Sequence, residues 1–455
     1  MGAARTLNVQ EIVDGSAVSG TQKKALALCF AFCLADGFDA LIIGFVVPSI
    51  SRDWDRSVAS LTPVTLAAVI GTIFGALLLA PLADHIGRRP VIICGAALFG
   101  IFTLAAAAAP NMETLAILRF VAGLGLGAVP ATLVAYGTEM APTRLRGTLV
   151  TVIGAGLATG GFLGGFAAGF LIPAFGWRSL FIVGGVLPLV LIVVAFRYLP
   201  ETVQFSAQAG KRDQVLTVLQ NIDPSLKIVD EEILTLDKRI EPGSNFRSLF
   251  ANRRGQMTVT LWVLYLCQFM GTFFILSWLP SVLTGAGVGE TTALLATSAC
   301  TLGGMLGGIF LGMTIDRVSA RFQILTAAYV TGAVAIVATA FTTGALPAMF
   351  IALFLTGFGV IGTGVCMNAV AAGLYPSRIR TTAIGWFNGF GRVGSVIGPA
   401  VGGLLLAMSL SAKTIFLLSV VPAVVSAMCV VVLSVVSRRV VPESEPLAAV
   451  QHSDV

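Results

Sequence analysis

The sequence predicts an all-α polytopic membrane protein, with twelve transmembrane helices in two pseudo-symmetric six-helix bundles. The first observation is composition: of 455 residues, 56% are hydrophobic and only 11% are charged, whereas about 25% are charged in soluble globular proteins. The second is that apolar runs of membrane-spanning length recur along the chain. The third is that motifs of the first half return, in the same order, in the second half.

Twelve apolar runs are long enough to cross a bilayer core, which takes about 20 residues of α-helix. Their approximate limits are 25–48, 62–83, 90–109, 113–137, 148–172, 178–198, 257–281, 291–314, 322–344, 347–372, 382–407 and 413–436. The first run is long and is followed by no small-residue cleavage site, so we expect a retained helix rather than a signal peptide.

The distribution of Lys and Arg predicts the orientation of these spans. If the N-terminus is inside, the inner segments hold 22 of the 28 basic residues and the outer loops hold four. The remaining two, Arg119 and Arg392, lie within spans. Because basic residues are enriched in cytoplasmic loops, we expect a multi-pass protein with both termini in the cytoplasm.

Three motifs reveal an internal repeat. Their second copies lie 232, 234 and 234 residues downstream, as in Asp84–Arg89 with Asp316–Arg321, Phe120–Gly125 with Phe354–Gly359, and Pro142–Arg146 with Pro376–Arg380. The repeat predicts an N-terminal bundle over 1–199 and a C-terminal bundle over 257–437. A charged cytoplasmic linker over 200–256 joins them, and a cytoplasmic tail over 438–455 follows.

Each charge within a span is present in only one of the two repeats, without a charged counterpart in the other. Alignment of the repeats sets Asp36 against Gln268 and Asp39 against Gly271. A charged side chain at the bilayer centre is costly and usually functional. At a rise of 1.5 Å per residue, Asp36 lies about 16 Å deep and Arg392 about 15 Å deep. This is the level at which transporters built from repeats hold their substrate.

Two hypotheses follow for these charges. Arg392 binds a substrate carboxylate through its planar, permanently charged guanidinium; the alternative is a structural pair with one of the aspartates. Asp36 or Asp39 takes up a co-transported proton; the alternative is a structural hydrogen bond to backbone or to Arg119. Arg119 lies only about 9 Å below the outer surface, so we do not expect it to meet the same ligand atoms.

The motifs resemble those of a known superfamily. Ala80–Arg89 resembles the loop motif of the major facilitator superfamily, and Arg119–Gly127 resembles its fourth-helix motif. Asp36-Gly37-Phe38-Asp39 is similar to a motif of the aromatic acid:proton symporters, as is the region Tyr375–Gly394. The resemblance implies the major facilitator fold in the bacterial inner membrane. It also implies a monomer that imports benzoate-type acids, such as 4-hydroxybenzoate or protocatechuate, with protons.

Further residues complete the expected site. Phe38 and Trp386 are candidates for stacking on an aromatic ring, although either could equally be packing, and Gln268 and Asn388 are polar candidates. The repeated loop charges suit gating, and the candidates are Asp84, Arg88, Arg89, Glu139, Arg144, Arg146, Asp316 and Arg317. We expect Glu139 to pair with Asp84, Arg88 or Arg89; the alternative is a solvated surface pair of little energetic value.

Several classes of function are disfavoured. No Gly-Lys-Ser/Thr phosphate loop appears, so ATP is not the expected energy source. Two histidines and seven cysteines without ligand spacing predict no metal or cofactor. Dispersed basic residues argue against nucleic acid, and no nucleophile–base set suggests an enzyme. Other organic anions or sugars remain alternative substrates, since Pro200-Glu201-Thr202 vaguely resembles a sugar-porter motif. A membrane sensor that transports nothing is the alternative from a different functional class.

Overall fold

The computed structural model describes residues 6–8, 14, 18–142, 146–210, 213, 215–216, 233–235, 246–251, 254–315, 318 and 320–440. Within them, twelve helices are long and apolar enough to cross a membrane, which confirms the predicted number of spans. Helix α2 runs over Gly20–Asp53, ten residues longer than expected. Its start is fixed by a capping box, in which Ser19 and Gln22 satisfy each other's backbone N–H groups.

The first half contains the elements up to α9. They are β1 (Thr6–Asn8), α2, η1 (Val58–Leu61), α3 (Thr62–Phe74), η2 (Gly75–Leu79), η3 (Ala80–Leu82), α4 (Ala83–Ile86), α5 (Arg88–Ala106), α6 (Met112–Met140), α7 (Arg146–Phe175), α8 (Arg178–Tyr198) and α9 (Val203–Gln208). The span predicted over 62–83 is thus a chain of short helical pieces with a π-turn at η2. Such π-turns interrupt helices that have functional constraints.

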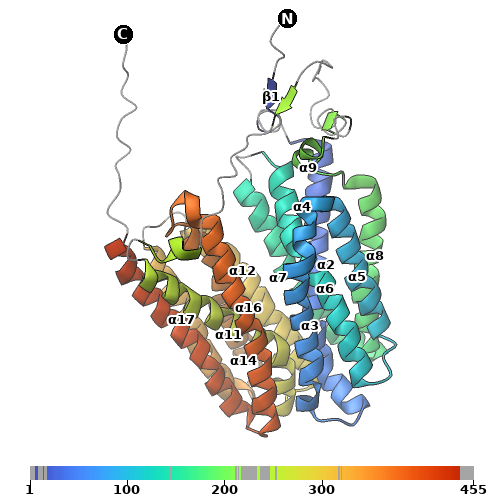
Figure 1. Cartoon of the computed structure of the whole chain (residues 1–455). Coiled ribbons are helices and arrows are strands. Elements are labelled where there is room, and N and C mark those ends of the chain that lie inside the picture. The colour runs from blue at the N-terminus through green and yellow to red at the C-terminus, as the bar shows by residue number, and fades with distance from the viewer. Residues whose placement is uncertain are drawn as a thin grey trace, which may run out of the picture.

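The second half contains the corresponding helices. After β2 (Ile233–Thr235) and η5 (Phe246–Leu249) come α11 (Gly255–Gly285), α12 (Glu290–Ile315), α13 (Arg321–Thr342), α14 (Leu346–Thr356), η6 (Gly357–Ile361), α15 (Gly362–Ala372), α16 (Ser377–Ala407) and α17 (Ala412–Val440). Figure 1 shows the two halves as neighbouring bundles. Strand β2, in the region expected to be a linker, pairs in parallel with β1; the sequence did not predict this small sheet.

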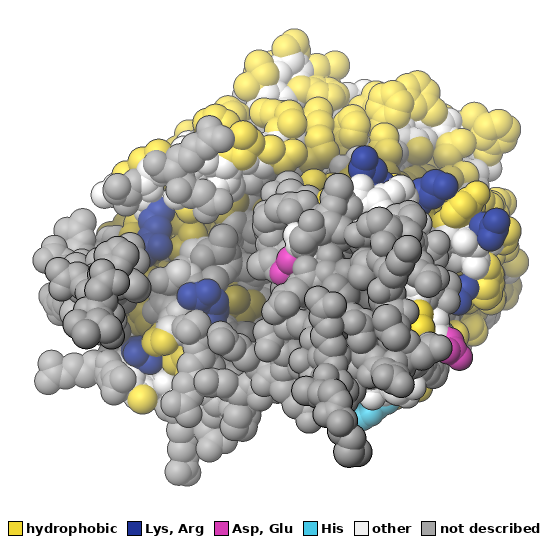
Figure 2. Space-filling view, turned by 90° about the horizontal axis from the view of Figure 1, so that it is seen from above, with side chains coloured by type: hydrophobic (Ala, Val, Ile, Leu, Met, Phe, Trp, Pro, Cys, Tyr) yellow, Lys and Arg dark blue, Asp and Glu magenta, His cyan; other side chains and the backbone are white. Residues whose placement is uncertain are grey.

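The first membrane-spanning helix, α2, begins and the last, α17, ends at the same end of the molecule (Figure 1). We call this the terminal end and the opposite one the far end. Seen from the terminal end, Lys and Arg side chains are spread among the described atoms (Figure 2). The domain limits 1–199 and 257–437 stay a prediction, although α8 ends at Tyr198 and α11 begins at Gly255.

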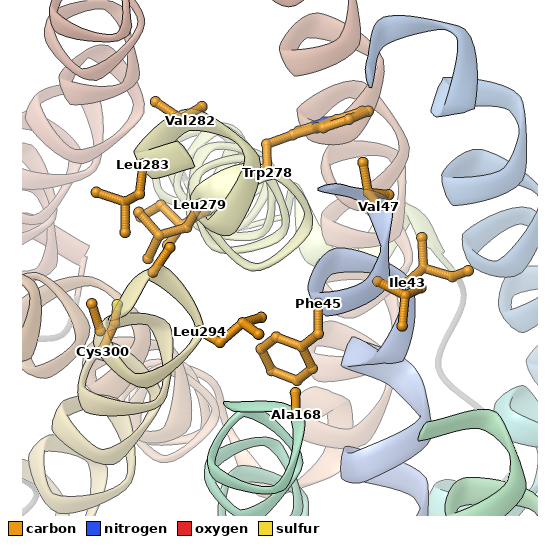
Figure 3. Close-up of a cluster of buried hydrophobic side chains, with 14 of the residues drawn as sticks. Ile43, Phe45, Val47, Ala168, Trp278, Leu279, Val282, Leu283, Leu294 and Cys300 are labelled. Carbon is orange, nitrogen blue, oxygen red and sulfur yellow. The ribbon is translucent and has the colours of Figure 1, made fainter. Parts of the chain in front are cut away.

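The two halves are packed together at the far end. One hydrophobic cluster takes side chains from both halves, including Phe45 and Val47 of α2, Trp278 of α11 and Leu294 of α12 (Figure 3). Among the described residues, the two main clusters toward the terminal end are each confined to one half. The described core therefore joins the halves at the far end and keeps them separate toward the terminal end.

A glycine and an ion pair complete this junction. Gly44 of α2 lies against the backbone of α11 so closely that an added Cβ would collide with the carbonyl oxygen of Leu276. At the edge, Arg52 of α2 forms an ion pair with Glu290 at the start of α12, and Ser49 donates a hydrogen bond to the same carboxylate. Close backbone approach through small residues is how membrane helices gain packing energy.

We predict that Gly44→Ala weakens the far-end junction, because the methyl group must displace α11 from α2. Spin labels at Asp55 and Lys413, which lie on different halves at the far end, should then show longer distances in a background without native cysteines. Gly20→Ala is the control, since a Cβ there would meet nothing within 4 Å. Identical distance distributions for the two variants would contradict this role of Gly44.

Candidate functional site

Asp39 and Arg119 form a fully buried ion pair inside the first bundle. Nη1 of Arg119, on α6, lies 3.1 Å from each carboxylate oxygen of Asp39, on α2, and both side chains are 0% exposed. Thr103 of α5 donates a 2.6 Å hydrogen bond to Asp39 Oδ1, and Nη2 of Arg119 donates to the Asp39 carbonyl at 3.1 Å. This geometry matches the alternative considered for Asp39, a structural bond to Arg119 instead of proton uptake. The charges of Asp39 and Arg119 neutralise each other within the first half.

Asp36 has a different environment, one helical turn away on α2. It is 3% exposed, and its Oδ1 is buried without a hydrogen-bond partner in the described part of the chain. A buried charge without such a partner is costly in a medium of low dielectric. Asp39 on the same helix repels this carboxylate, and Arg392 of α16, in the other half, attracts it. The electrostatic interaction of Asp36 and Arg392 therefore links the two halves.

Arg392 is placed by the packing of α16 against α11. Gly394 and Gly398 lie against the backbone of α11, where no side chain would fit, and they hold the two helices in contact. Arg392 lies on the largely opposite side of α16 from these two glycines and is partly buried. Among the described residues no hydrogen bond or ion pair of its guanidinium is found, so its donors are available to a ligand.

Gln268, the polar residue opposite Asp36 in the repeat, is fully engaged within the second bundle. Its amide donates to Thr272 Oγ1 at 3.1 Å and to the Val360 carbonyl at 2.7 Å. Its oxygen accepts from Tyr329 at 2.6 Å and from Thr363 at 3.4 Å. These four bonds use the hydrogen-bonding capacity of an amide side chain. Gln268 therefore links helices of the second bundle and leaves no hydrogen-bonding group free for a ligand.

The aromatic candidates lie in unlike surroundings. Phe38 is buried in the first bundle, where its ring packs against the positions of Gly164 and Gly184 on α7 and α8. This is the packing alternative for Phe38. Trp386 on α16 is 44% exposed, so its indole ring presents a large accessible surface.

Asn388 belongs to a polar cluster that sequence reasoning only partly identified. Its amide donates to Asn368 Oδ1 on α15 at 3.0 Å and to the Ile384 carbonyl at 2.9 Å. Tyr265 of α11 donates to the same oxygen of Asn368 at 2.9 Å. The sequence signal for Asn368 is an isolated amide in an apolar span, which is weaker than the signal of a charged residue there.

Loop charges at the terminal end form the network considered for gating. Arg88 lies 2.8 Å from Glu139 and 2.9 Å from Asp84, so the ion pair expected for Glu139 is present, while its role in gating stays a prediction. The guanidinium of Arg89 donates to the Phe196 carbonyl at 3.0 Å. The remaining gating candidates are outside the described residues: Arg144, Asp316, Arg317 and the side chain of Arg146.

Glu201 is a member of this network that sequence reasoning missed. Its carboxylate accepts hydrogen bonds from the backbone N–H groups of Arg88 at 3.1 Å, Arg89 at 3.2 Å and Thr202 at 2.9 Å. It therefore sits at the N-terminus of α5, where the helix dipole favours an anion. Gly87, with φ of 107°, leaves room for this carboxylate, since any Cβ there would collide with it.

Comparison with known proteins decides the family. A model of the Major Facilitator Superfamily matches residues 28–295 and 261–453. The chain belongs to the major facilitator superfamily. It is 33% identical to the 4-hydroxybenzoate transporter PcaK of Acinetobacter baylyi, over 95% of each chain. It is also 31% identical to a gallate transporter of Pseudomonas putida, over 93% of this chain and 94% of the relative.

These relatives place the chain in the superfamily's family of aromatic acid transporters, as the motifs suggested. It is a multi-pass membrane transporter and not an enzyme. The fold is likewise similar to the inward-open xylose transporter XylE of Escherichia coli, with a TM-score of 0.67 and 18% identity over 94% of this chain and 98% of that one. This likeness confirms the predicted major facilitator fold.

We predict that breaking the Asp39–Arg119 pair from one side destabilises the protein strongly. Asp39→Asn or Arg119→Gln leaves one buried charge without its partner, which costs about 3–5 kcal/mol. The double variant, which removes both charges, should be more stable than either single one. Thermal unfolding of the purified variants in detergent measures this, and single variants that melt like the unmodified protein would show the pair to be dispensable.

Proposed function

We propose that this transporter imports an aromatic carboxylate of the hydroxybenzoate type in symport with protons, by alternating access. It works as a monomer in the bacterial cytoplasmic membrane, with the terminal end on the cytoplasmic side. The single observation that carries the proposal is the pairing of a buried, incompletely bonded carboxylate, Asp36, with an available guanidinium, Arg392, across the two halves. The printed names of the relatives support the aromatic substrate.

Arg392 binds the carboxylate of the substrate. Its planar guanidinium suits the two oxygens of a carboxylate, and its charge near the middle of the membrane requires an anionic partner. In the substrate-free protein Asp36 supplies that negative charge electrostatically, without a direct ion pair among the described residues. A bound aromatic acid would supply it directly.

Asp36 is the residue we assign to the proton, in preference to Asp39. Asp39 already has Arg119 and Thr103 as hydrogen-bonding partners, whereas Asp36 depends on a charge in the other half. When the substrate carboxylate engages Arg392, Asp36 loses this compensation and its protonation is favoured. Binding of substrate and binding of proton are thereby coupled, as required for symport.

Alternating access would use charged residues at both ends. Arg52–Glu290 joins the halves at the far end, and Arg88, Glu139 and Asp84 form the network at the terminal end. We propose that the far-end junction opens when the terminal end closes. The state with a packed far end then corresponds to a site that faces the cytoplasm.

Other organic anions are the second candidate for the substrate, because a guanidinium binds any carboxylate. A sugar is less well supported, since Gln268 has no free hydrogen bond to offer. Proteoliposomes with an imposed pH gradient separate these classes. Uptake of hydroxybenzoates accompanied by proton entry, with neither for aliphatic acids or xylose, is the result expected; uptake of xylose alone would refute the proposal.

We predict that Arg392→Lys lowers uptake by about tenfold or more while the protein stays in the membrane. Lysine keeps the positive charge but loses the second, charge-assisted hydrogen bond, worth about 1.5 kcal/mol or more. Arg178→Lys is a matched control, because Arg178 is half exposed at the far end. Normal uptake by the Arg392 variant, at equal amounts in the membrane, would sink the assignment.

We also predict that Asp36→Asn abolishes accumulation driven by a pH gradient but retains exchange of labelled for unlabelled substrate. The amide cannot carry the proton, whereas the substrate-loaded carrier can still reorient in both directions, which is all that exchange requires. Both activities are measured in the same proteoliposomes. Undiminished gradient-driven accumulation by this variant would assign proton coupling elsewhere.

A further inference from the structure

One face of α16 carries a charged residue, a polar residue and two glycines. Gly385, Asn388, Gly389 and Arg392 lie within about 100° of one another around the helix, at 3.6 residues per turn. A polar side chain and a charged side chain thus lie one turn apart, with two glycines beside them. Trp386 borders the same face and is largely accessible.

The glycines of this face lie opposite open space. A Cβ added at Gly385 or Gly389 would meet no heavy atom within 4 Å. Gly394 and Gly398, by contrast, lie against the backbone of α11, where a Cβ would collide. Helix packing thus explains the second pair of glycines but not the first.

This open face is directed toward the other half of the protein. Gly403 lies about five full turns after Gly385, on the same side of α16, and its Cα position lies against Thr62 of α3. Arg392 also interacts electrostatically with Asp36 of α2, so this side of the helix is directed toward the first bundle. Gly389 and Asn388 are three and four residues before Arg392 and share its side of the helix. The open space is therefore next to the site between the two halves.

Asn388 and Asn368 leave complementary polar groups unused in this space. Asn368 Oδ1 accepts from both Tyr265 and Asn388, and the Asn368 side chain is exposed. Among the described residues, Asn368 Nδ2 and Asn388 Oδ1 have no hydrogen-bond partner. These two groups, on side chains that are hydrogen-bonded to each other, offer a donor and an acceptor, and a hydroxyl group can accept from the one and donate to the other.

The spacing fits a ring with a group at each end. Asn388 and Arg392 are separated by a rise of about 6 Å along α16, comparable to the separation of the carboxyl carbon and the para substituent of a benzoate. A ring lying over Gly389 would contact the helix backbone directly. Its carboxylate would reach Arg392 and its hydroxyl would reach the two asparagines.

We infer that this face of α16 is the platform for the aromatic ring, and that Asn368 together with Asn388 recognises a hydroxyl group on it. The inference rests on the proposed function and deepens it, because it names the residues that distinguish hydroxylated from unsubstituted aromatic acids. In this arrangement Arg392 provides affinity for aromatic carboxylates in general, and the asparagines provide the preference for those that carry a hydroxyl group.

The ring platform is tested with Gly389→Ala and Gly385→Ala. Each methyl group has room in the substrate-free protein and replaces glycine by a better helix former, so thermal stability should be kept or raised. The methyl group of Gly389→Ala nevertheless occupies space assigned to the ring, so affinity for 4-hydroxybenzoate should fall about tenfold or more in this variant, and less in Gly385→Ala, whose methyl group lies one turn further along the same face. Gly20→Ala is the control, and undiminished affinity in both variants would overturn the platform.

The hydroxyl site is tested with Asn368→Leu and Asn388→Leu, which keep the approximate volume of the side chain. Binding of 4-hydroxybenzoate and of benzoate is measured by competition on the purified full-length protein. The preference for the hydroxylated acid should fall about tenfold or more, with benzoate binding nearly unchanged. Thr339→Val is the control, because Thr339 bonds only within its own helix, to the carbonyl of Ala335.

The outcomes separate this inference from the proposed function. If the unmodified protein binds no benzoate of either kind, the proposed function fails. If it binds them, and the asparagine variants weaken both acids equally or leave the preference unchanged, only the hydroxyl site fails. If a leucine variant does not fold, the ring platform is still tested by the two glycine variants. Their folding is favoured because alanine is a better helix former than glycine.

Discussion

The need to compensate charge inside the membrane organises this structure. Helix α2 carries two carboxylates one turn apart, and they are treated differently. Asp39 is neutralised inside its own bundle by Arg119, with Thr103 completing its hydrogen bonds. Oδ1 of Asp36 has no hydrogen-bond partner among the described residues, and Asp36 interacts with the positive charge of Arg392 in the other half. One carboxylate therefore stabilises a bundle, while the other makes the relation between the bundles sensitive to charge.

The packing of the helices makes this sensitivity useful. Glycines such as Gly44 allow the halves to touch through their backbones at the far end, where a shared hydrophobic cluster and the Arg52–Glu290 pair also lie (Figure 3). Toward the terminal end, each half has its own core. A small change in the charge balance between the halves can thus favour one packing over another, because packed interfaces change between discrete arrangements.

Much of the fold could be predicted from sequence, because the bilayer imposes a length and a composition on every span. The twelve spans followed from this constraint, the internal repeat from three matched motifs, and the superfamily from the resemblance of those motifs to known ones. The predicted helix ends were less accurate than the number of helices. For example, α2 begins at Gly20, capped by Ser19, because its capping box lies outside the apolar run. The π-turn at η2 and the small sheet of β1 and β2 depend on tertiary contacts and left no periodic signal.

The site was predicted in its charges but not in its pairings. Asp36, Asp39, Arg119 and Arg392 stood out because charge is rare in apolar spans. Sequence could not decide which aspartate pairs with Arg119, since that depends on helix rotation. Gln268 is a polar candidate in the sequence, but four hydrogen bonds within the second bundle engage its amide. Asn368 and Glu201 were missed, because their importance comes from neighbours distant in the sequence.

The assignment of the proton to Asp36 is the central claim, and proton exchange on binding tests it most directly. Purified protein in weakly buffered detergent solution is mixed with 4-hydroxybenzoate, and a pH indicator reports protons taken up at equilibrium. Uptake by the unmodified protein that disappears in Asp36→Asn, while the ligand still binds, is the result we expect. Undiminished proton uptake by a variant that lacks the Asp36 carboxylate would contradict the account.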